Sequence, residues 1–242
     1  MRPALAFALA CVPTIAGAQA PRDIVTVEAL SDLVERGLSA TDGKGALRAR
    51  IGGTVAGGFR LDASAATLRG SIRNGGADAG IDLIASYRAV RGTLSLDGGV
   101  TGRLYAGASG KLDYVELFGG ASALIGPAEV GLTAAYAPDQ ASIGGDNLYL
   151  RARAVAAVIG TPISLTGHVG RSSGSVDDVA RSARLRPDGT YHDWSVGAEY
   201  VRGAVTLGLS YTDSDVRPDR APLPALARRS GARLIARAGL TF

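Results

Sequence analysis

Hydrophobic and polar residues alternate one by one along most of the chain. In the segment 46–55, for example, Leu47 and Ala49 alternate with Arg48 and Arg50. A period of two places successive side chains on opposite faces of a β-strand, and little of the sequence has the 3.6-residue period of a helix. The pattern therefore predicts an all-β protein whose strands have one apolar face and one polar face.

Twelve segments carry this alternation, and the connections between them alternate in length. The predicted strands are 24–37, 46–55, 59–65, 81–87, 94–104, 114–124, 128–136, 148–153, 163–169, 194–200, 205–212 and 233–242. The tight connections fall at 56–58, 89–92, 125–127, 160–162 and 202–203, and the longer ones at 38–45, 66–79, 106–113, 137–146, 172–190 and 213–230. Short turns on one rim and long loops on the other are typical of membrane barrels. The sequence predicts a transmembrane antiparallel up-and-down β-barrel of about 12 strands.

In lipid, an open sheet edge would leave backbone groups unpaired, so the last strand is expected to pair with the first. We expect the Leu/Ile/Val/Ala face to point outward to lipid and the Arg/Asp/Ser/Thr face to point inward. The alternative is a soluble barrel or sandwich with a dry core. The small Ala and Gly residues of the apolar face would pack such a core poorly, and Gly accounts for 34 of 242 residues.

The N-terminal segment predicts export. An apolar stretch at 4–15 follows a positive start and ends at Ala18-Gln19-Ala20, a pattern typical of a cleaved secretory signal. A buried helix or a lipoprotein signal at Cys11 are the alternatives. We predict a signal peptide at 1–20, a single barrel domain at 21–242 and a location in the bacterial outer membrane.

The last predicted strand ends on an aromatic residue. Leu234 and Leu240 share its outward face with Phe242, whereas Arg233 and Arg237 face inward. A strand that ends in Phe resembles the C-terminal signal of bacterial outer-membrane barrels. The resemblance implies that the barrel-assembly machinery is a partner, recognised through the strand that ends in Phe242.

Composition excludes several other functions. Cys11 is the only cysteine, so disulfides and cysteine metal sites are not expected in the mature chain. The formal net charge of +4 is too small to indicate nucleic-acid binding. No metal or other cofactor is predicted.

Charged residues on the polar face are the candidate functional residues. The predicted lumen-lining residues are Arg48, Arg50, Arg151, Arg153, Arg233, Arg237, Glu28 and Asp32. The last strand lies beside the first two, so most of this set is expected to form one charged belt. Such charges either pair to fill a small barrel or create a transverse field across a water-filled constriction. The second interpretation predicts a weak preference for anions.

Catalysis and lipid contact have candidate residues of their own. Ser164 and His168 share an inward face, but no orienting acid is apparent beside them, so the sequence predicts no enzyme. Arg228 and Arg229 in the last long loop are candidates for contact with lipopolysaccharide phosphates, although a solvated loop is the simpler interpretation.

Several strand and turn motifs are similar to those of the TorF-like family of outer-membrane porins. The similar motifs are Ser31-Asp32, Arg36-Gly37 and Asp42-Gly43-Lys44, the central segments 104–107 and 114–120, and the blocks 191–200 and 207–215. The resemblance covers nearly the whole mature chain and implies an outer-membrane porin. We therefore predict passive diffusion of small polar solutes or ions. The alternative is a non-conducting barrel with a structural or adhesive role carried by its long loops.

Overall fold

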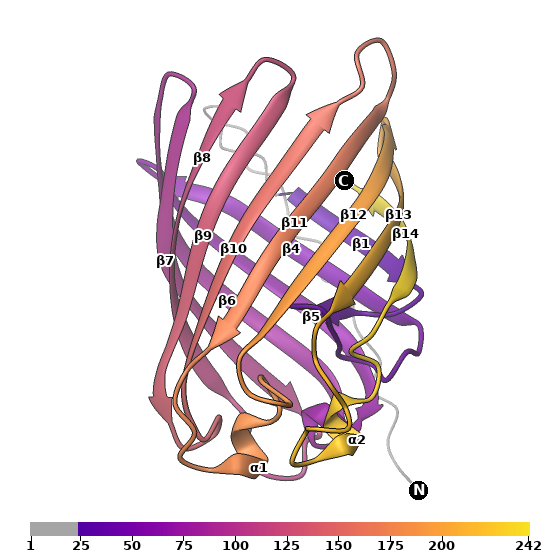
Figure 1. Cartoon of the computed structure of the whole chain (residues 1–242). Helices are drawn as coiled ribbons and strands as arrows, with labels where there is room; N and C mark the ends of the chain where they lie inside the picture. The colour runs from indigo at the N-terminus through magenta and orange to yellow at the C-terminus, as the bar shows by residue number, and fades with distance from the viewer. Residues whose placement is uncertain (1–23) are drawn as a thin grey trace, which may run out of the picture.

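The computed structural model describes residues 24–242 and shows a closed barrel of antiparallel strands (Figure 1). The predicted signal peptide at 1–20 lies outside the described residues. The barrel strands are β1 (Ile24–Leu30), β4 (Ala46–Ala56), β5 (Phe59–Ser71), β6 (Ala77–Arg91), β7 (Leu94–Ala106), β8 (Tyr114–Ile125), β9 (Ala128–Gln140), β10 (Gly145–Ala157), β11 (Ile163–Ser173), β12 (Tyr191–Arg202), β13 (Val205–Ser214) and β14 (Arg233–Thr241).

Each barrel strand pairs with its neighbour along the chain, except where β1 closes the ring. There β1 pairs with both β4 and β14, and Thr26 lies opposite Thr241 across the closing seam. The closed ring satisfies the backbone hydrogen bonds that a sheet edge would leave open. The prediction of a closed antiparallel barrel with 12 strands is confirmed.

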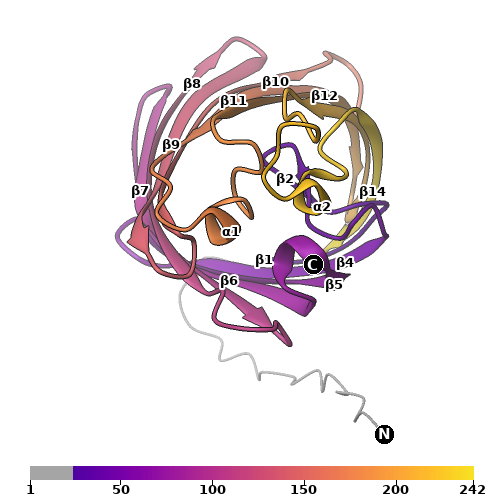
Figure 2. The ribbon, with the colours of Figure 1, turned by 60° about the horizontal axis from the view of Figure 1, so that its bottom comes forward.

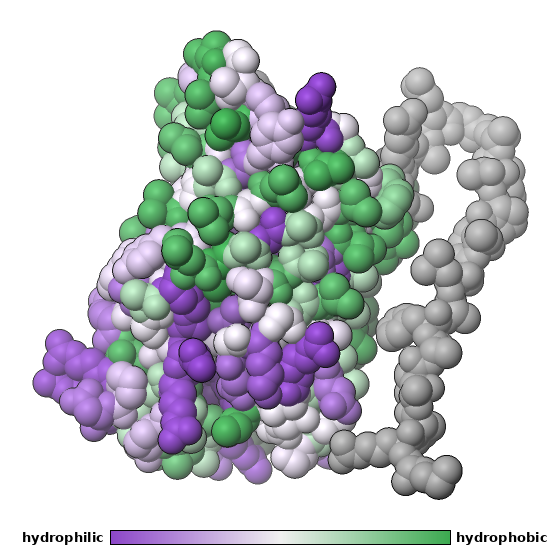
Figure 3. Space-filling model, turned by 90° about the vertical axis from the view of Figure 1, so that its right-hand side faces the viewer, coloured by the Kyte–Doolittle hydropathy of each residue, from purple (hydrophilic) through white to green (hydrophobic). Residues whose placement is uncertain are grey.

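The two faces of the wall separate apolar from polar side chains as the alternation predicts. On β14 the side chain of Leu234 is 66% exposed on the outside, while that of Ile235 faces inward and is 8% exposed. Figure 3 shows hydrophobic side chains over the upper part of one face and hydrophilic ones around the lower rim. This distribution inverts that of a soluble barrel with an apolar core. Among the described residues, no helix is long and apolar enough to cross a membrane.

The two rims of the barrel differ as expected. One rim has tight turns; the other carries the longer connections, with η1 (Ile72–Asn74), α1 (Val179–Ser182) and α2 (Pro224–Ala227) (Figure 1). The predicted long connections at 66–79 and 137–146 were too long, because β5, β6, β9 and β10 extend into them. The alternation is obscured there by a β-bulge at Arg69-Gly70, where both residues have positive φ, and by an irregular register beside Gly145.

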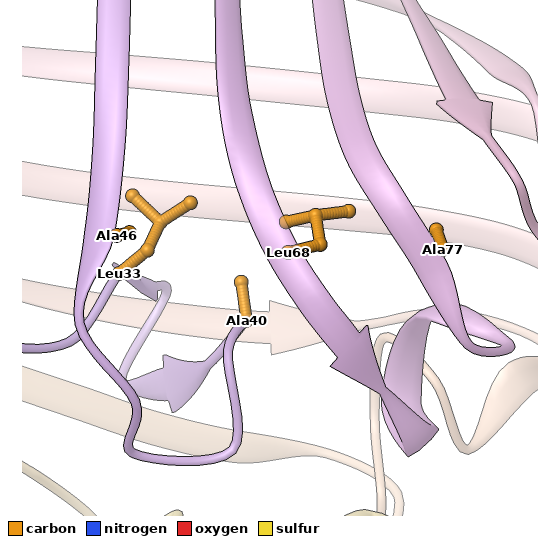
Figure 4. Close-up of a cluster of buried hydrophobic side chains, with 5 residues drawn as sticks. All are labelled: Leu33, Ala40, Ala46, Leu68 and Ala77. Atoms are coloured by element: carbon orange, nitrogen blue, oxygen red, sulfur yellow. The ribbon is translucent and has the colours of Figure 1, made fainter. Parts of the chain in front are cut away.

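The first predicted strand, 24–37, was also too long. Strand β1 ends at Leu30, and the chain then turns into the barrel, where β2 (Val34–Glu35) and β3 (Leu38–Ser39) form a two-stranded hairpin (Figure 2). Leu33 is buried in a cluster with Ala46 of β4, Leu68 of β5 and Ala77 of β6 (Figure 4). This apolar cluster explains why a segment with a strand-like pattern leaves the wall.

Candidate functional site

The hairpin β2–β3 crosses the interior of the barrel. Its turn consists of Arg36 and Gly37, both with positive φ (52° and 74°), which suits a two-residue hairpin turn. A Cβ on Gly37 would lie 2.6 Å from the Cβ of Asp193 in β12. The turn therefore touches the wall so closely that glycine is required there.

Ion pairs hold the hairpin to the wall across the ring from β1. The Arg36 guanidinium donates to both carboxylate oxygens of Glu116 in β8, at 2.7 and 2.9 Å. Arg103 in β7 donates to Glu116 at 3.1 Å and to Glu35 of the hairpin at 3.2 Å. The Tyr191 hydroxyl donates to the carbonyl oxygen of Arg36. The tip of the hairpin is thus held by β7 and β8 on the far side of the ring and by β12 beside its turn.

Electrostatics of the hairpin favour the charged forms of its ionisable groups. Burial raises the pKa of the Glu35 carboxyl, but the nearby arginines, Arg103 foremost, lower it more, and the resulting pKa lies below its usual value. For Arg36, burial lowers the pKa, but Glu116, through its charge and its hydrogen bond, and Tyr114 together raise it more, and the resulting pKa is raised. The ion pairs are therefore fully formed at neutral pH.

Five of the eight predicted lumen residues meet in ion pairs along the seam of the barrel. Glu28 accepts from Arg48 at 2.7 Å and from Arg237 at 3.2 Å. Asp32 accepts from Arg233 at 3.0 Å, and its carboxylate also accepts hydrogen bonds from the hydroxyls of Ser39 and Thr41. These charges are largely neutralised by one another.

The three other predicted residues are placed differently. Arg153 pairs with Glu129 of β9 and is likewise neutralised. The Arg50 side chain is 53% exposed, and its nearest carboxylate oxygen, on Glu28, is as far as 4.0 Å away. Arg151 forms no ion pair with any residue in 24–242, and its Nε is buried without a hydrogen-bond partner. Arg50 and Arg151 are therefore the weakly paired cations of the predicted set.

Arg50 and Arg151 line the same interior cavity, which has a volume of about 450 Å³. Strand β4 carries Arg50 and β10 carries Arg151; β5 to β9 separate them on one side and β1 and β11 to β14 on the other. The two guanidinium groups therefore project from opposite walls. A second cavity of about 370 Å³ also adjoins Arg151, and Leu33 and Val34 of the inward-folded segment line both cavities.

A cluster that the sequence reasoning missed lies on β11 and β12. The hydroxyl of Ser195 is 2.7 Å from Nδ1 of His168, and Nε2 of His168 is 2.9 Å from a carboxylate oxygen of Asp193. The expectation that His168 has no acid beside it was wrong, and no hydrogen bond joins it to Ser164 within the described residues. The signal was the spacing of Asp193 and Ser195, which share one face of a strand, but the register that places them beside His168 appears only in the fold.

The long connections cover the rim of the barrel that carries η1, α1 and α2. Arg73 donates to the carbonyl oxygen of Arg184 at 2.6 Å, and Arg184 donates back to that of Arg73 at 3.1 Å. Burial lowers the pKa of Arg184 and that of Arg186, which donates to the carbonyl oxygen of Gly174. Leu38 of the hairpin packs against Tyr191 and the last long connection. Arg228 and Arg229 are exposed on that connection.

The chain thus forms a closed barrel that is apolar outside and has a charged interior narrowed by the inward-folded hairpin. Similar folds are found in the KdgM porin (TM-score 0.56, 10% identity, covering 91% of this chain and 97% of that one) and the NanC porin (TM-score 0.57, 11% identity, 91% and 99%). An outer membrane channel from Pseudomonas putida F1 is also similar (TM-score 0.57, 12% identity, 94% and 97%). At these identities the likeness concerns the fold.

The chain belongs to a family described as a bacterial protein of unknown function (Gcw_chp), whose model matches residues 16–229. The matching family model is therefore not named as the TorF-like family that the sequence motifs resemble, and membership of that family is not confirmed. No curated protein sequence matches the chain.

Proposed function

We propose that the protein is a porin-like channel of the bacterial outer membrane that passes small polar solutes or ions with a weak preference for anions. The observation that carries the proposal is the interior cavity lined by Arg50 and Arg151 from opposite walls. A barrel filled only by closely paired charges would have neither the space nor the weakly paired cations. Two guanidinium groups facing a water-filled space attract anions and repel cations.

The membrane location rests on the wall of the barrel. Its strands other than β1, which has 7 residues, are long enough to cross a hydrocarbon core, which takes about 9–11 tilted residues, and its outer face is apolar. The exposed Arg228 and Arg229 are suited to contact lipopolysaccharide phosphates at the long-loop rim. Strand β14 with the outward-facing Phe242 suits recognition by the barrel-assembly machinery. The resemblance of 191–200 and 207–215 to TorF-like porins supports the same assignment.

Conductance in planar lipid bilayers tests the proposal. Purified protein, refolded without residues 1–20, should give single-channel events, and a salt gradient should give a reversal potential that indicates modest anion selectivity. Absence of events over many insertions would contradict the channel. It would favour the alternative, a non-conducting barrel with a structural or adhesive role, for which the capped long-loop rim is the supporting observation.

Selectivity is tested by removing the two weakly paired cations. The double variant Arg50→Gln, Arg151→Gln should move the reversal potential toward zero or toward cation selectivity. The matched control is Arg153→Gln combined with Glu129→Gln, which removes an ion pair from the same interior without changing its net charge. Equal reversal potentials in the two double variants would contradict the assignment of selectivity to Arg50 and Arg151.

A further inference from the structure

We propose that the barrel also contains a catalytic site for ester hydrolysis. Ser195 is its nucleophile, His168 its general base and Asp193 the residue that orients the base. This site goes beyond the proposed channel and does not depend on whether the barrel conducts.

The three side chains form one continuous hydrogen-bonded chain. Ser195 Oγ lies 2.7 Å from His168 Nδ1, and His168 Nε2 lies 2.9 Å from Asp193 Oδ2. Because the carboxylate only accepts, Nε2 carries a proton toward it, and in the neutral ring Nδ1 is left to accept the serine proton. These distances are those expected of a nucleophile, its base and the group that orients the base.

The three side chains differ in burial in the way that nucleophilic catalysis requires, from a buried acid to an accessible hydroxyl. The Asp193 side chain is fully buried, His168 is 27% exposed, and Ser195 and His168 both line the cavity of about 370 Å³. A buried carboxylate stabilises the imidazolium that forms when the base takes a proton. The reacting hydroxyl, in contrast, faces a space that a small molecule can occupy.

This arrangement requires a glycine, Gly170, in β11. His168 lies opposite Ser195 in the register of β11 and β12, and Gly170 lies opposite Asp193. A Cβ on Gly170 would lie 2.3 Å from the Tyr149 hydroxyl and 2.5 Å from Asp193 Oδ1. Glycine thus lets Tyr149 of β10 reach across β11 and donate at 3.1 Å to Asp193 Oδ2, the same oxygen that His168 contacts, which gives the carboxylate a second orienting hydrogen bond.

The cavity indicates the class of substrate. Its size admits a small ester, and Arg151 lines it together with Ser195 and His168. The Nε of Arg151 has no hydrogen-bond partner among residues 24–242. A free guanidinium group at this position favours an ester that carries a carboxylate.

The reaction follows from these positions. Ser195 Oγ attacks the ester carbonyl carbon while its proton passes to His168 Nδ1, and the alcohol leaves with that proton. Water then attacks the acyl-serine, giving a proton to His168 that returns to Ser195 as the acid departs. Water is the co-reactant in this hydrolysis, and no redox change occurs.

The refolded barrel tests the proposal directly. A small fluorophosphonate probe should label the protein, with the adduct located on Ser195 by peptide mass spectrometry, and the barrel should hydrolyse 4-acetoxybenzoate. Ser195→Ala should abolish labelling, and His168→Asn should reduce hydrolysis by about 10²-fold or more. The matched control Ser164→Ala, an inward serine not bonded to His168, should retain both activities.

Heat-modifiable gel mobility verifies that every variant is a folded barrel. An unlabelled wild-type barrel, or labelling that persists in Ser195→Ala, would overturn the proposal and identify the three residues as a structural hydrogen-bond network. Arg151→Gln should raise KM for 4-acetoxybenzoate more than for neutral 4-nitrophenyl acetate. Equal KM changes would overturn the assigned substrate charge.

Discussion

Glu116 is the residue whose loss should release the hairpin from the far wall. Its carboxylate is 2% exposed and accepts hydrogen bonds from Arg36 and from Arg103. In Glu116→Gln the barrel wall keeps its strand pairing, because the side chain contributes nothing to the backbone ladder of β7, β8 and β9. The hairpin, in contrast, loses the charge that opposes its own Arg36.

The size of the effect follows from burial. Removing one partner of a buried ion pair costs about 3–5 kcal/mol, because the other charge stays buried without compensation. We take the lower end, about 3 kcal/mol, because Arg103 keeps Glu35 as a second partner and the amide still accepts one hydrogen bond. Since about 1.4 kcal/mol corresponds to a factor of ten, the population with the hairpin released should rise roughly a hundredfold.

A cysteine at position 34 reports this opening. Val34 lines both interior cavities, and without residues 1–20 an introduced thiol is the only one in the chain. A maleimide larger than these cavities should label Val34→Cys slowly in the otherwise unchanged barrel and roughly a hundredfold faster together with Glu116→Gln. Single-channel conductance should rise in the same variant.

The control is Glu129→Gln, which removes a carboxylate paired with Arg153, where both side chains are about one-third exposed. Its effect on labelling should be small, because exposed pairs contribute about 0–1 kcal/mol. Equal labelling rates in the barrels with and without Glu116→Gln would refute the inference that this ion pair holds the hairpin.

Two further predictions use the same protein. Gly170→Ala should separate Tyr149 from Asp193 and destabilise the barrel by about 1–3 kcal/mol. Gly102→Ala is the control and should not destabilise it, because its new methyl group would be 4.0 Å from the nearest neighbour. The two variants are compared by the temperature at which each barrel shifts its gel mobility. The pKa of Glu35 is lowered in the folded state, so its contribution is present above its ordinary pKa of about 4.3 and is lost as pH falls through the lowered value. Because maleimide reacts with the thiolate, each labelling rate is divided by that of a free thiol at the same pH. This relative rate for the Val34→Cys reporter should accelerate below about pH 4, and a relative rate that is independent of pH would contradict it.

The wall of the barrel could be predicted from the sequence because the orientation of each side chain depends only on its position within its own strand. Each strand has one face in an apolar environment and one in a polar environment, so alternation alone assigns the two faces. The outward Leu234 and the inward Ile235 of β14 illustrate this, because they are equally hydrophobic and only their position in the alternation separates them.

The interior could not be read in the same way because it depends on contacts between distant segments. Leu33 continues the period-two pattern of the first strand, and only its contact with Leu68 and neighbouring alanines explains its place inside the ring. The period-two alternation likewise assigned four arginines to the inward face without separating paired from weakly paired cations. These are Arg48, Arg50, Arg151 and Arg153. The bonds from His168 to Ser195 and Asp193 required the register between β11 and β12.

The hairpin is fixed by two kinds of interaction that respond to different conditions. Its base is held by apolar burial of Leu33, which acid or salt changes little, whereas its tip is held by Arg36, Glu116, Arg103 and Glu35, which respond to acid. Replacing such an ion-pair cluster by hydrophobic residues is often neutral or stabilising, so stability alone does not account for it. We therefore expect acid to release the tip while the base and the wall of the barrel stay in place. Replacing Arg36, Glu116, Arg103 and Glu35 together by methionine should therefore keep the barrel stable, while labelling of Val34→Cys, measured relative to a free thiol at each pH, becomes independent of pH. Persistent acid acceleration would assign the response to another group.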